Sequence, residues 1–417
     1  MLHSFFSKIA LICICISTYA QVETEIAPPY NIKTVSFVQN GQNTIPLFGL
    51  NDSFQLQFDD LFGNEANYYY EIVHCNYDWK PSDLTKNEYL GGFDGLRIQE
   101  YSNSFNTLQL YSHYKLTFPN RYTQFQVSGN YVIKVLNEDK DVVFSRKFIL
   151  YEDLVSVPMQ VKRSRNLNTI NQKQNLDFAI KSTTVLFQSP LQNIKVLLLQ
   201  NGNLNTAISN IKPMYTIGND LIYKYDSETQ FWAGNEFYYF ENKNIRVANN
   251  FIATVDSKNS VYNAHLFTCN ARANRPYTYS PDINGNYTVL NNNAEKNETE
   301  ADYAWVFFRL SAPSFYLKKD IYVNGMFNNF GLTAENKMDY NESEGIYEKA
   351  VMIKQGFTNF QYVVADSHGN IDGENAIDGN FYQTENNYFA IVYYRENNQR
   401  YDRVIGKGIA SSIDITN

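Results

Sequence analysis

Cysteine, tryptophan and histidine are scarce in this sequence, and basic residues do not outnumber acidic ones. The 417 residues include 4 Cys, 3 Trp and 5 His, with 35 Lys and Arg against 43 Asp and Glu. The formal net charge of −8 argues against a nucleic-acid partner, because phosphates require a basic patch on the protein. The sequence therefore predicts no nucleic-acid binding.

The motifs of common catalytic and metal sites are also missing. His74, His113, His265 and His368 stand in no His-x-x-x-His pattern, and no Cys-x-x-Cys pair occurs, although zinc sites use these spacings. The chain has no Gly-x-Ser-x-Gly elbow and no phosphate-binding glycine loop. We therefore predict that the protein is not an enzyme and that it uses no cofactor or metal.

The one apolar run that suggests targeting lies at the N-terminus. Lys8 supplies a positive charge, Ile9–Ile16 form an apolar core, and Ala20 is a small residue before Gln21. This order is typical of a secretory signal peptide, and the core is too short to span a bilayer. We predict a signal peptide at residues 1–20 and an exported chain that does not insert into a membrane.

Two cysteines, Cys75 and Cys269, remain after such a cleavage. An oxidising compartment permits a disulfide bridge between them. The two residues fall in segments that we assign to different domains, and free cysteine is often buried as a small apolar residue. The sequence favours two buried thiols and leaves the bridge open.

Tyrosine and phenylalanine are abundant and lie in short segments separated by polar turns. The 33 Tyr and 29 Phe make up most of the aromatic share of 16%, and both residues favour strands. Examples of predicted strands are Ile32–Val38, Tyr68–Val73, Thr107–Leu116 and Tyr388–Tyr394. Because the chain is too long for a single core, we predict an all-β protein with tandem β-sandwich domains.

Polar stretches indicate where these domains end. Residues 166–175 read as a boundary, and residues 291–298, with almost no apolar side chains, read as a linker. The segment after the linker holds several short strands within about a hundred residues, which is typical of an immunoglobulin-like sandwich. The predicted division is a signal peptide at 1–20, an N-terminal β-sandwich domain at 21–158, a middle β domain at 159–298 and a C-terminal immunoglobulin-like domain at 299–417.

The segment His74–Trp79, with the sequence HCNYDW, contains several chemically active side chains at the end of a predicted strand. Alternation along the strand would place His74, Asn76 and Asp78 on one face. Neighbours on a strand point apart, which argues against a nucleophile pair of His74 and the adjacent thiol. Metal binding by the polar face stays open, but hydrogen bonding to neighbouring strands and turns is the favoured interpretation.

The loop Asp366–Glu374 alternates oxygen donors with glycines, as calcium loops do. Ile371 stands where an EF-hand pattern needs glycine, and the distal glutamate is out of register. A solvated hairpin loop is therefore the favoured interpretation over a calcium site.

The segment Val323–Phe330 resembles the Gly-x-Phe-Asn-x-Trp signature of early-set immunoglobulin-like modules, which include starch-binding ones. Phe330 stands where those modules often carry tryptophan. The resemblance supports a sandwich over residues 301 to about 395. It also keeps an alternative function open, that of an exported carbohydrate-binding β-sandwich protein.

A longer series of motifs runs through the first segment and returns near the C-terminus. Its parts are Phe54–Leu61, Tyr68–Ser82, Glu88–Phe93, Tyr101–Thr107, Tyr111–Tyr114, Phe118–Asn120, Ser128–Tyr131, Gly379–Asn386 and Val392–Arg395. Their order closely resembles the plug proteins of the Bacteroidota type IX secretion system. The motif residues predicted to have structural roles are His74, Cys75, Asn76, Asp78, Trp79, Pro81, Tyr101, Asn106, Asn328, Asn329 and Phe330.

The resemblance to this family implies a mechanical function. Its members lie at the periplasmic mouth of the very large outer-membrane barrel through which folded proteins leave the cell, and they seal that barrel when it is idle. For this chain the resemblance implies a non-catalytic plug. We expect it to be periplasmic and peripherally associated with the translocon barrel, its partner.

Overall fold

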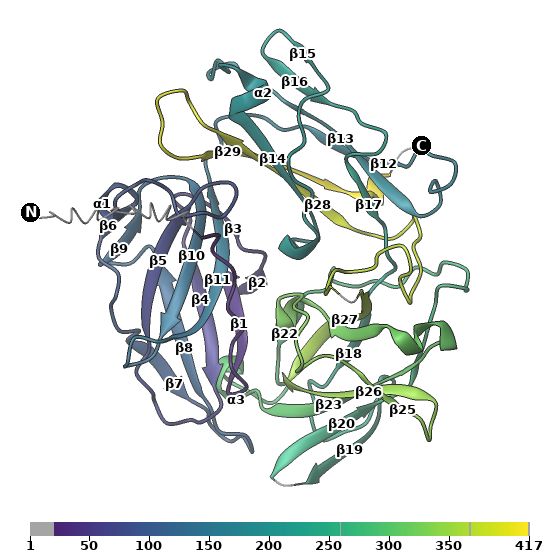
Figure 1. The fold of residues 1–417 in the computed structure, drawn as a ribbon. Coiled ribbons are helices and arrows are strands. Elements are labelled where there is room, and N and C mark those ends of the chain that lie inside the picture. The colour runs from purple at the N-terminus through teal and green to yellow at the C-terminus, as the bar shows by residue number, and fades with distance from the viewer. Residues whose placement is uncertain (1–20, 259, 367, 416–417) are drawn as a thin grey trace, which may run out of the picture.

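The computed structural model describes residues 21–258, 260–366 and 368–415, so the predicted signal peptide lies outside the described residues. Strands account for 45% of the chain and helices for 6%. The larger sheets pack in pairs into three β-sandwiches, the first on the left of Figure 1 and the other two stacked on the right. The predicted all-β class and tandem β-sandwich domains are confirmed.

The first sandwich packs a sheet of order β2-β1-β4-β8-β7 against a sheet of order β3-β11-β10-β5. Aromatic side chains on alternating positions fill the space between them, and the rings of Phe48 and Phe54 stack 4.0 Å apart. Its elements are β1 Ile32–Gln39, β2 Gln42–Thr44, β3 Leu47–Gly49, β4 Phe54–Asp60, β5 Tyr69–Cys75, α1 Lys86–Tyr89, β6 Leu90–Gly92, β7 Glu100–Asn103, β8 Ser112–Phe118, β9 Thr123–Phe125, β10 Gly129–Leu136 and β11 Val142–Tyr151.

The second sandwich packs the sheet β12-β13-β16-β15, which β17 extends beside β13, against the sheet β14-β28-β29. Buried valine, leucine and isoleucine side chains from both sheets form its core. Its elements are β12 Met159–Arg163, β13 Lys173–Ile180, α2 Pro190–Asn193, β14 Ile194–Gln200, η1 Leu204–Thr206, β15 Tyr215–Ile217, β16 Asp220–Tyr223, β17 Gln230–Trp232, β28 Asn387–Tyr394, β29 Arg403–Ser411 and η4 Ser412–Asp414.

The third sandwich packs β27 and its partners β18, β22 and β24 against the sheet β19-β20-β23-β26-β25. Phe240, Phe308 and Phe360 meet in its core. Its elements are β18 Tyr238–Glu241, β19 Ile252–Lys258, β20 Val261–Leu266, β21 Cys269–Asn270, β22 Tyr287–Val289, α3 Asn297–Glu300, β23 Tyr303–Ser311, η2 Ser314–Lys318, β24 Asp320–Asn324, η3 Met326–Asn328, β25 Asp339–Asn341, β26 Ile346–Lys354 and β27 Gly356–Ala365.

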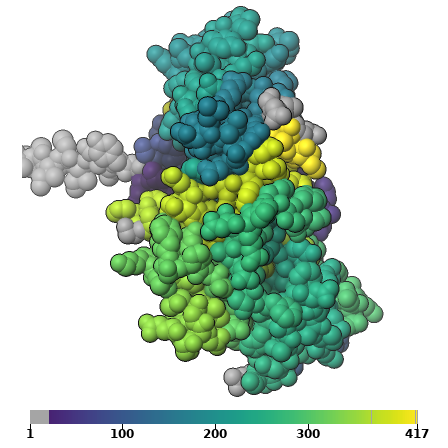
Figure 2. Space-filling view, turned by 90° about the vertical axis from the view of Figure 1, so that its right-hand side faces the viewer, coloured from purple at the N-terminus to yellow at the C-terminus, as the bar shows by residue number. Residues whose placement is uncertain are grey.

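The second and third sandwiches are interleaved along the chain. The chain leaves the second after β17, builds the third, and returns as β28 and β29, which lie at the waist between the two in Figure 2. The predicted boundary between residues 298 and 299 therefore lies inside the third sandwich, whose core draws on residues 240–377. Consecutive strands are neighbours in most sheets, and the pairing of β14 with β28 breaks that rule.

Two predicted local features also differ from the structure. The predicted strand Thr107–Leu116 begins only at Ser112, since residues 104–111 form a loop. The predicted boundary at residues 166–175 is the turn of the β12–β13 hairpin together with the start of β13. In the first place the aromatic pattern marked a real strand but placed its start too early. In the second the polar pattern marked a turn within a hairpin rather than the end of a domain.

Candidate functional site at the joints between the sandwiches

The segment His74–Trp79 forms a tight loop at the end of β5. The strand ends at Cys75, because the Asn76 amide donates to the Lys80 carbonyl (2.8 Å) and the Trp79 amide donates to the Asn76 carbonyl (2.9 Å). Trp79 adopts a left-handed conformation with φ 61°. The predicted alternation of faces therefore stops at Cys75, and the loop instead projects Tyr77 out of the first sandwich.

Tyr77 enters the second sandwich. Its hydroxyl donates to the Val196 carbonyl on β14 (2.9 Å) and accepts from the Asn210 amide (2.8 Å). Its ring meets Tyr393 of β28 edge to face, with centroids 4.9 Å apart. A single aromatic side chain thus anchors one sandwich in the sheet of another.

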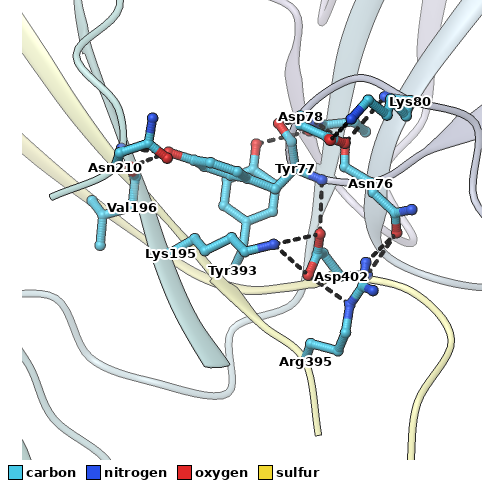
Figure 3. Close-up of polar contacts among 11 residues, drawn as sticks. Asn76, Tyr77, Asp78, Lys80, Lys195, Val196, Asn210, Tyr393, Arg395 and Asp402 are labelled. Carbon is cyan, nitrogen blue, oxygen red and sulfur yellow. Dashed lines mark hydrogen bonds and ion pairs between the residues drawn. The ribbon is translucent and has the colours of Figure 1, made fainter. Parts of the chain in front are cut away.

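A buried carboxylate, Asp402, completes this joint (Figure 3). It accepts from the Tyr77 amide (3.0 Å), from the Arg395 guanidinium (2.9 Å) and from the Lys195 ammonium (3.2 Å). The Asn76 side-chain oxygen accepts from Arg395 (2.7 Å) and from the Asp402 amide (3.2 Å). Each charge that the joint buries is therefore hydrogen-bonded, which limits its desolvation cost.

Apolar side chains surround this network. The cluster joins β3 and β11 of the first sandwich with β14, β28 and β29 of the second, and its buried members are Leu47, Tyr77, Ile149, Tyr151, Leu197, Leu199, Ile391, Tyr393 and Val404. Joints between domains of one chain are usually more polar and allow motion. An apolar cluster of this kind holds the two sandwiches in one orientation.

The first sandwich is joined to the third through a second buried carboxylate, Asp59 of β4. It accepts from Lys354 of β26 (2.6 Å), from the Tyr303 hydroxyl (2.6 Å) and from His113 of β8 (2.6 Å). Burial raises the pKa of Asp59, but Lys354 and His113 outweigh this effect and hold the pKa below its usual value. The carboxylate is therefore ionised inside the joint.

The extended segment that precedes β1 fastens the same joint from another side. Glu25 accepts from the Lys147 amide of the first sandwich (2.6 Å) and from the Asn329 side chain of the third (2.5 Å). Arg146 donates to Asn329 (2.8 Å) and lies 3.5 Å from Glu25. Because Asn205 of the second sandwich donates to the Phe330 carbonyl (3.1 Å), all three sandwiches meet at this turn.

The second and third sandwiches are connected by the two segments in which the chain passes between them, residues 233–237 (the first crossing) and 366–386 (the second crossing). Gly234 of the first crossing donates to Asn380 and accepts from Thr384 of the second. Glu236 is buried between the crossings and accepts from the Glu385 amide (3.1 Å). Burial raises its pKa to about 7. The two crossings are therefore hydrogen-bonded to each other and connect the sandwiches as one unit rather than as two separate linkers.

A cavity of about 1100 Å³ lies where the three sandwiches meet. Side-chain amides are frequent in its lining, and Trp232 is the tryptophan that borders it. A sugar-binding platform needs an open ring face, but the Lys173 ammonium lies 4.1 Å above the Trp232 ring and Gly373 packs against its edge. Trp79 is likewise covered, by Lys147 at 4.4 Å. These contacts count against a sugar platform at Trp79 and Trp232, whereas Trp305 on β23 is 40% exposed.

The predicted motif residues fall into three groups. His74, Cys75, Asn76, Asp78, Trp79 and Pro81 lie in or beside the joint loop, and Asn328, Asn329 and Phe330 lie at the three-way meeting point. Tyr101 and Asn106 lie at the far end of the first sandwich. The structure brings the first two groups to the joints. Asn106 lies in a loop whose Phe105 and Leu108 amides donate to the third sandwich, and Tyr101 bonds Glu65. A structural role for each of them stays a prediction.

Within the joint loop, burial separates the supporting residues from an exposed one. His74 is buried, with Nδ1 2.7 Å from the Ser82 hydroxyl and Nε2 3.4 Å from the Ser128 carbonyl. A Cβ on Gly129 would stand 2.2 Å from Nε2, so this position requires glycine. Asp78, by contrast, is exposed and forms a surface ion pair with Lys80.

Cys75 and Cys269, the cysteines within the described residues, do not form a disulfide bridge. Cys75 lies in the first sandwich and is buried, while Cys269 lies in the third and is half-buried. Burial raises the pKa of Cys75 to about 12 and that of Cys269 to about 11. Both groups are therefore thiols at neutral pH.

Neither a metal cluster nor a membrane-spanning helix is found in the described part of the chain. Among those residues no group of three or more His, Cys, Asp or Glu is arranged to hold a metal ion. No helix in the same residues has the length and apolar composition needed to cross a bilayer. In the loop predicted to be a solvated hairpin, the Asp366 carboxylate caps the amides of His368 and Asn370.

The sequence did not single out the buried charged residues of the joints. Asp59, Lys354 and Asp402 each stand in or beside an apolar strand segment. A charged residue within such a segment was the only sign in the sequence that these side chains are buried. Lys354 and Asp59 bond each other although they lie 295 residues apart in the sequence, and Tyr77 and Asp402 bond each other across 325 residues. A single sequence gives no means of pairing groups at such distances.

The fold and the joints define a class of protein, a scaffold of three β-sandwiches held together by buried polar networks. The family model described as Type 9 secretion system plug protein 1st domain matches residues 32–152, which is the first sandwich. The chain belongs to the type IX secretion system plug protein family and is a component associated with that system.

A solved structure extends the similarity to nearly the whole chain. A hypothetical protein from Parabacteroides merdae ATCC 43184, with a crystal structure at 2.30 Å resolution, is 32% identical with a TM-score of 0.88. The match covers 94% of this chain and 100% of that one. No curated protein matches the chain.

The buried state of His74 predicts a pH dependence of stability. Burial lowers its pKa to about 4, whereas an unfolded histidine titrates near 6.5. Below about pH 6.5 the unfolded chain takes up a proton that the folded chain refuses, so stability falls as the pH drops. The expected loss between about pH 6.5 and pH 4 is about 3 kcal/mol. This loss is the contribution of His74 alone, because buried Glu236, whose pKa rises to about 7, gains stability over the same pH window. The measurement is therefore the difference between the urea-unfolding slopes of wild type and His74→Gln, which should lack the His74 contribution.

The matched control lies four residues along the same loop. Asp78→Ala changes an exposed residue and a surface ion pair, so it should shift stability by less than about 1 kcal/mol at neutral pH and leave the acid slope between about pH 6.5 and pH 4 in place. An equal slope in wild type and His74→Gln would contradict the assignment of this acid sensitivity to His74.

Proposed function

We propose that this protein is a non-catalytic plug that closes the periplasmic opening of the outer-membrane translocon barrel of the type IX secretion system. It is periplasmic, associates peripherally with the barrel and does not insert into the membrane. The observation that carries the proposal is that the sandwich matched by the plug family model is fastened to both other sandwiches through buried hydrogen-bonded carboxylates. Those joints make one broad body from three domains.

A broad fixed body suits the closing of a wide pore. A barrel that passes folded proteins leaks when idle unless something of matching width covers it. Flexibly linked domains would shift against each other, since motion between domains is the usual expectation. Here the Asp59 network opposes such motion toward the third sandwich, and the Asp402 network opposes it toward the second. The protein seals by shape and stiffness, without reaction chemistry.

The proposal predicts a leak in cells that lack the protein. Deletion should make cells sensitive to a bulky hydrophilic antibiotic such as vancomycin, because the open barrel would admit molecules that the outer membrane excludes. The measurement is the growth-inhibiting concentration in wild-type, deletion and complemented cells. Complementation with the full chain should restore resistance.

The control is a second deletion, of the barrel itself. Removing the barrel in the plug-deleted strain should abolish the added sensitivity, because the leak runs through that pore. Sensitivity that persists without the barrel would mean that the protein protects the envelope by another route, and the plug proposal would fall.

A further inference from the structure

Five large apolar side chains are exposed together at one end of the first sandwich, where β4 and β7 end and β1 and β8 begin. We call this set the end patch, and its residues are Tyr30, Phe62, Phe105, Leu108 and Leu110. The rings of Tyr30 and Phe62 meet edge to face at 5.7 Å. The backbone of Gly63 packs against Leu110, since a Cβ there would stand 3.3 Å from the Leu110 Cβ. Tyr30, Phe62 and Leu110 therefore lie next to each other although they come from three chain segments.

The loop that carries Phe105, Leu108 and Leu110 is held in place rather than free. The Ser104 amide donates to the Tyr111 carbonyl (2.8 Å), and the Phe105 amide donates to the Thr299 carbonyl of the third sandwich (2.9 Å). The Leu108 amide donates to the Asp302 carboxylate (2.6 Å). Asn106, one of the predicted motif residues, turns the loop with φ 57°. The fold thus holds apolar side chains outward on a fixed frame.

A carboxylate is held at the rim of the end patch. Glu65 has φ 54°, a strained conformation for a residue other than glycine. Its two oxygens accept from Tyr101, another motif residue, at 2.9 Å and from Asn103 at 2.5 Å, and these bonds lower its pKa. In the described part of the chain no cation lies within ion-pair distance of Glu65. Its charge is therefore available to a partner.

From this arrangement we infer that the end patch docks on the periplasmic rim of the translocon barrel. The matching segment of the barrel carries apolar side chains beside a lysine or arginine, which pairs with Glu65 and lies against the exposed rings. This inference rests on the proposed function and adds to it the surface that meets the barrel. It also gives Tyr101 and Asn106 a purpose that the joints do not supply, the shaping of a docking face.

The size of the patch fits an anchor within a larger interface. At about 200 Å² for each aromatic side chain, the three exposed rings leave on the order of 400 Å² uncovered. That is as large as the largest apolar patch of a typical monomer, about 300–600 Å². It is also about half of the roughly 800 Å² that one partner buries in a stable interface. Apolar anchors at the centre of an interface commonly dominate its affinity.

The test compares two triple variants of the full chain with an affinity tag. The first is Phe62→Ser, Phe105→Ser and Leu110→Ser in the end patch, where these side chains are 54–70% exposed. The matched control is Met214→Ser, Tyr215→Ser and Ile217→Ser in β15 and the residue before it, where the side chains are 44–64% exposed. The amount of barrel retained from detergent-solubilised outer membranes is measured by mass spectrometry, and vancomycin sensitivity is measured in the same strains.

We expect the end-patch variant to retain about tenfold less barrel or worse and to sensitise cells, while the β15 variant behaves as wild type. Both variants change exposed residues, so circular dichroism and thermal melting should match wild type. A charge reversal, Glu65→Lys, provides a second probe and should also reduce retention.

Several outcomes would overturn the inference. One is an end-patch variant that retains the barrel and seals as wild type does; the plug proposal would then stand and only the surface would be wrong. Another is equal loss in the β15 control. A third is a concentration-dependent dimer of the wild-type chain that the end-patch variant abolishes, since the patch would then face a second copy. If deletion causes no leak and wild type retains no barrel, the proposed function itself fails.

Discussion

Replacing Lys354 by methionine should lower the free energy of unfolding by about 3–5 kcal/mol, the cost of leaving a buried charge without its partner. The Lys354 and Asp59 side chains are 3% and 0% exposed, so water does not replace the lost ammonium. Methionine keeps the apolar stem that packs over Tyr111, where the ammonium now lies 4.1 Å from the ring. Urea unfolding followed by circular dichroism measures the difference.

Two further variants separate the buried charge from general damage. Lys337→Ala breaks a surface pair with Asp320 at 2.8 Å and should cost no more than about 1 kcal/mol. The double variant Lys354→Met with Asp59→Leu removes both charges and should be more stable than Lys354→Met alone, because no ion is left buried. A Lys354→Met protein as stable as Lys337→Ala would show that the joint does not depend on this pair.

Much of the fold was predictable because strand signals are local. Tyr69–Cys75 combines aromatic and β-branched residues and forms a strand close to the predicted Tyr68–Val73. What the sequence could not reveal is which strands become neighbours. β14 pairs along its length with β28, although the whole third sandwich lies between them in the chain. That pairing depends on shape and burial in three dimensions, not on local preference.

The candidate site was predictable only in part. The segment HCNYDW lies at a joint, where Tyr77 and Trp79 pack against the apolar cluster between the first two sandwiches. The strand alternation assumed for Asp78 failed because hydrogen bonds of Asn76 close a turn first. Asp402 escaped notice because an isolated aspartate near a strand is usually exposed. Its importance comes from the groups that the fold brings to it, the Tyr77 amide of the first sandwich and the Lys195 and Arg395 side chains of the second.

The Asp59 and Asp402 joints of the first sandwich share one physical design. In each, a carboxylate that would be costly to bury alone accepts from a cation and from a backbone or hydroxyl donor of another sandwich. Such groups fix one relative orientation, since a shift of the third sandwich would separate Lys354 from Asp59, and a shift of the second sandwich would remove the Tyr77 amide from buried Asp402. The polar networks therefore serve the proposed sealing function by fixing the geometry of the three sandwiches rather than by adding total stability.

Tyr77 offers the strongest test of that link. Tyr77→Ala should open the joint between the first and second sandwiches, with a cost of about 3–5 kcal/mol for removing a buried aromatic side chain. The amides of residue 77 and Asp402 donate across the joint, to Asp402 and to Asn76, so their hydrogen exchange reports joint opening directly. Their exchange should accelerate by about a hundredfold or more, while the amides of β10 keep their protection.

Tyr77→Phe is the matched control, because it keeps the ring against Tyr393 and removes only the hydroxyl that bonds Val196 and Asn210. It should cost about 1–3 kcal/mol and accelerate the same amides less than Tyr77→Ala does. Cells that carry Tyr77→Ala should also become more sensitive to vancomycin at equal protein level, since a plug with a loose joint no longer matches its pore. If joint amides exchange faster and cells stay fully resistant, stiffness at this joint is not required for sealing.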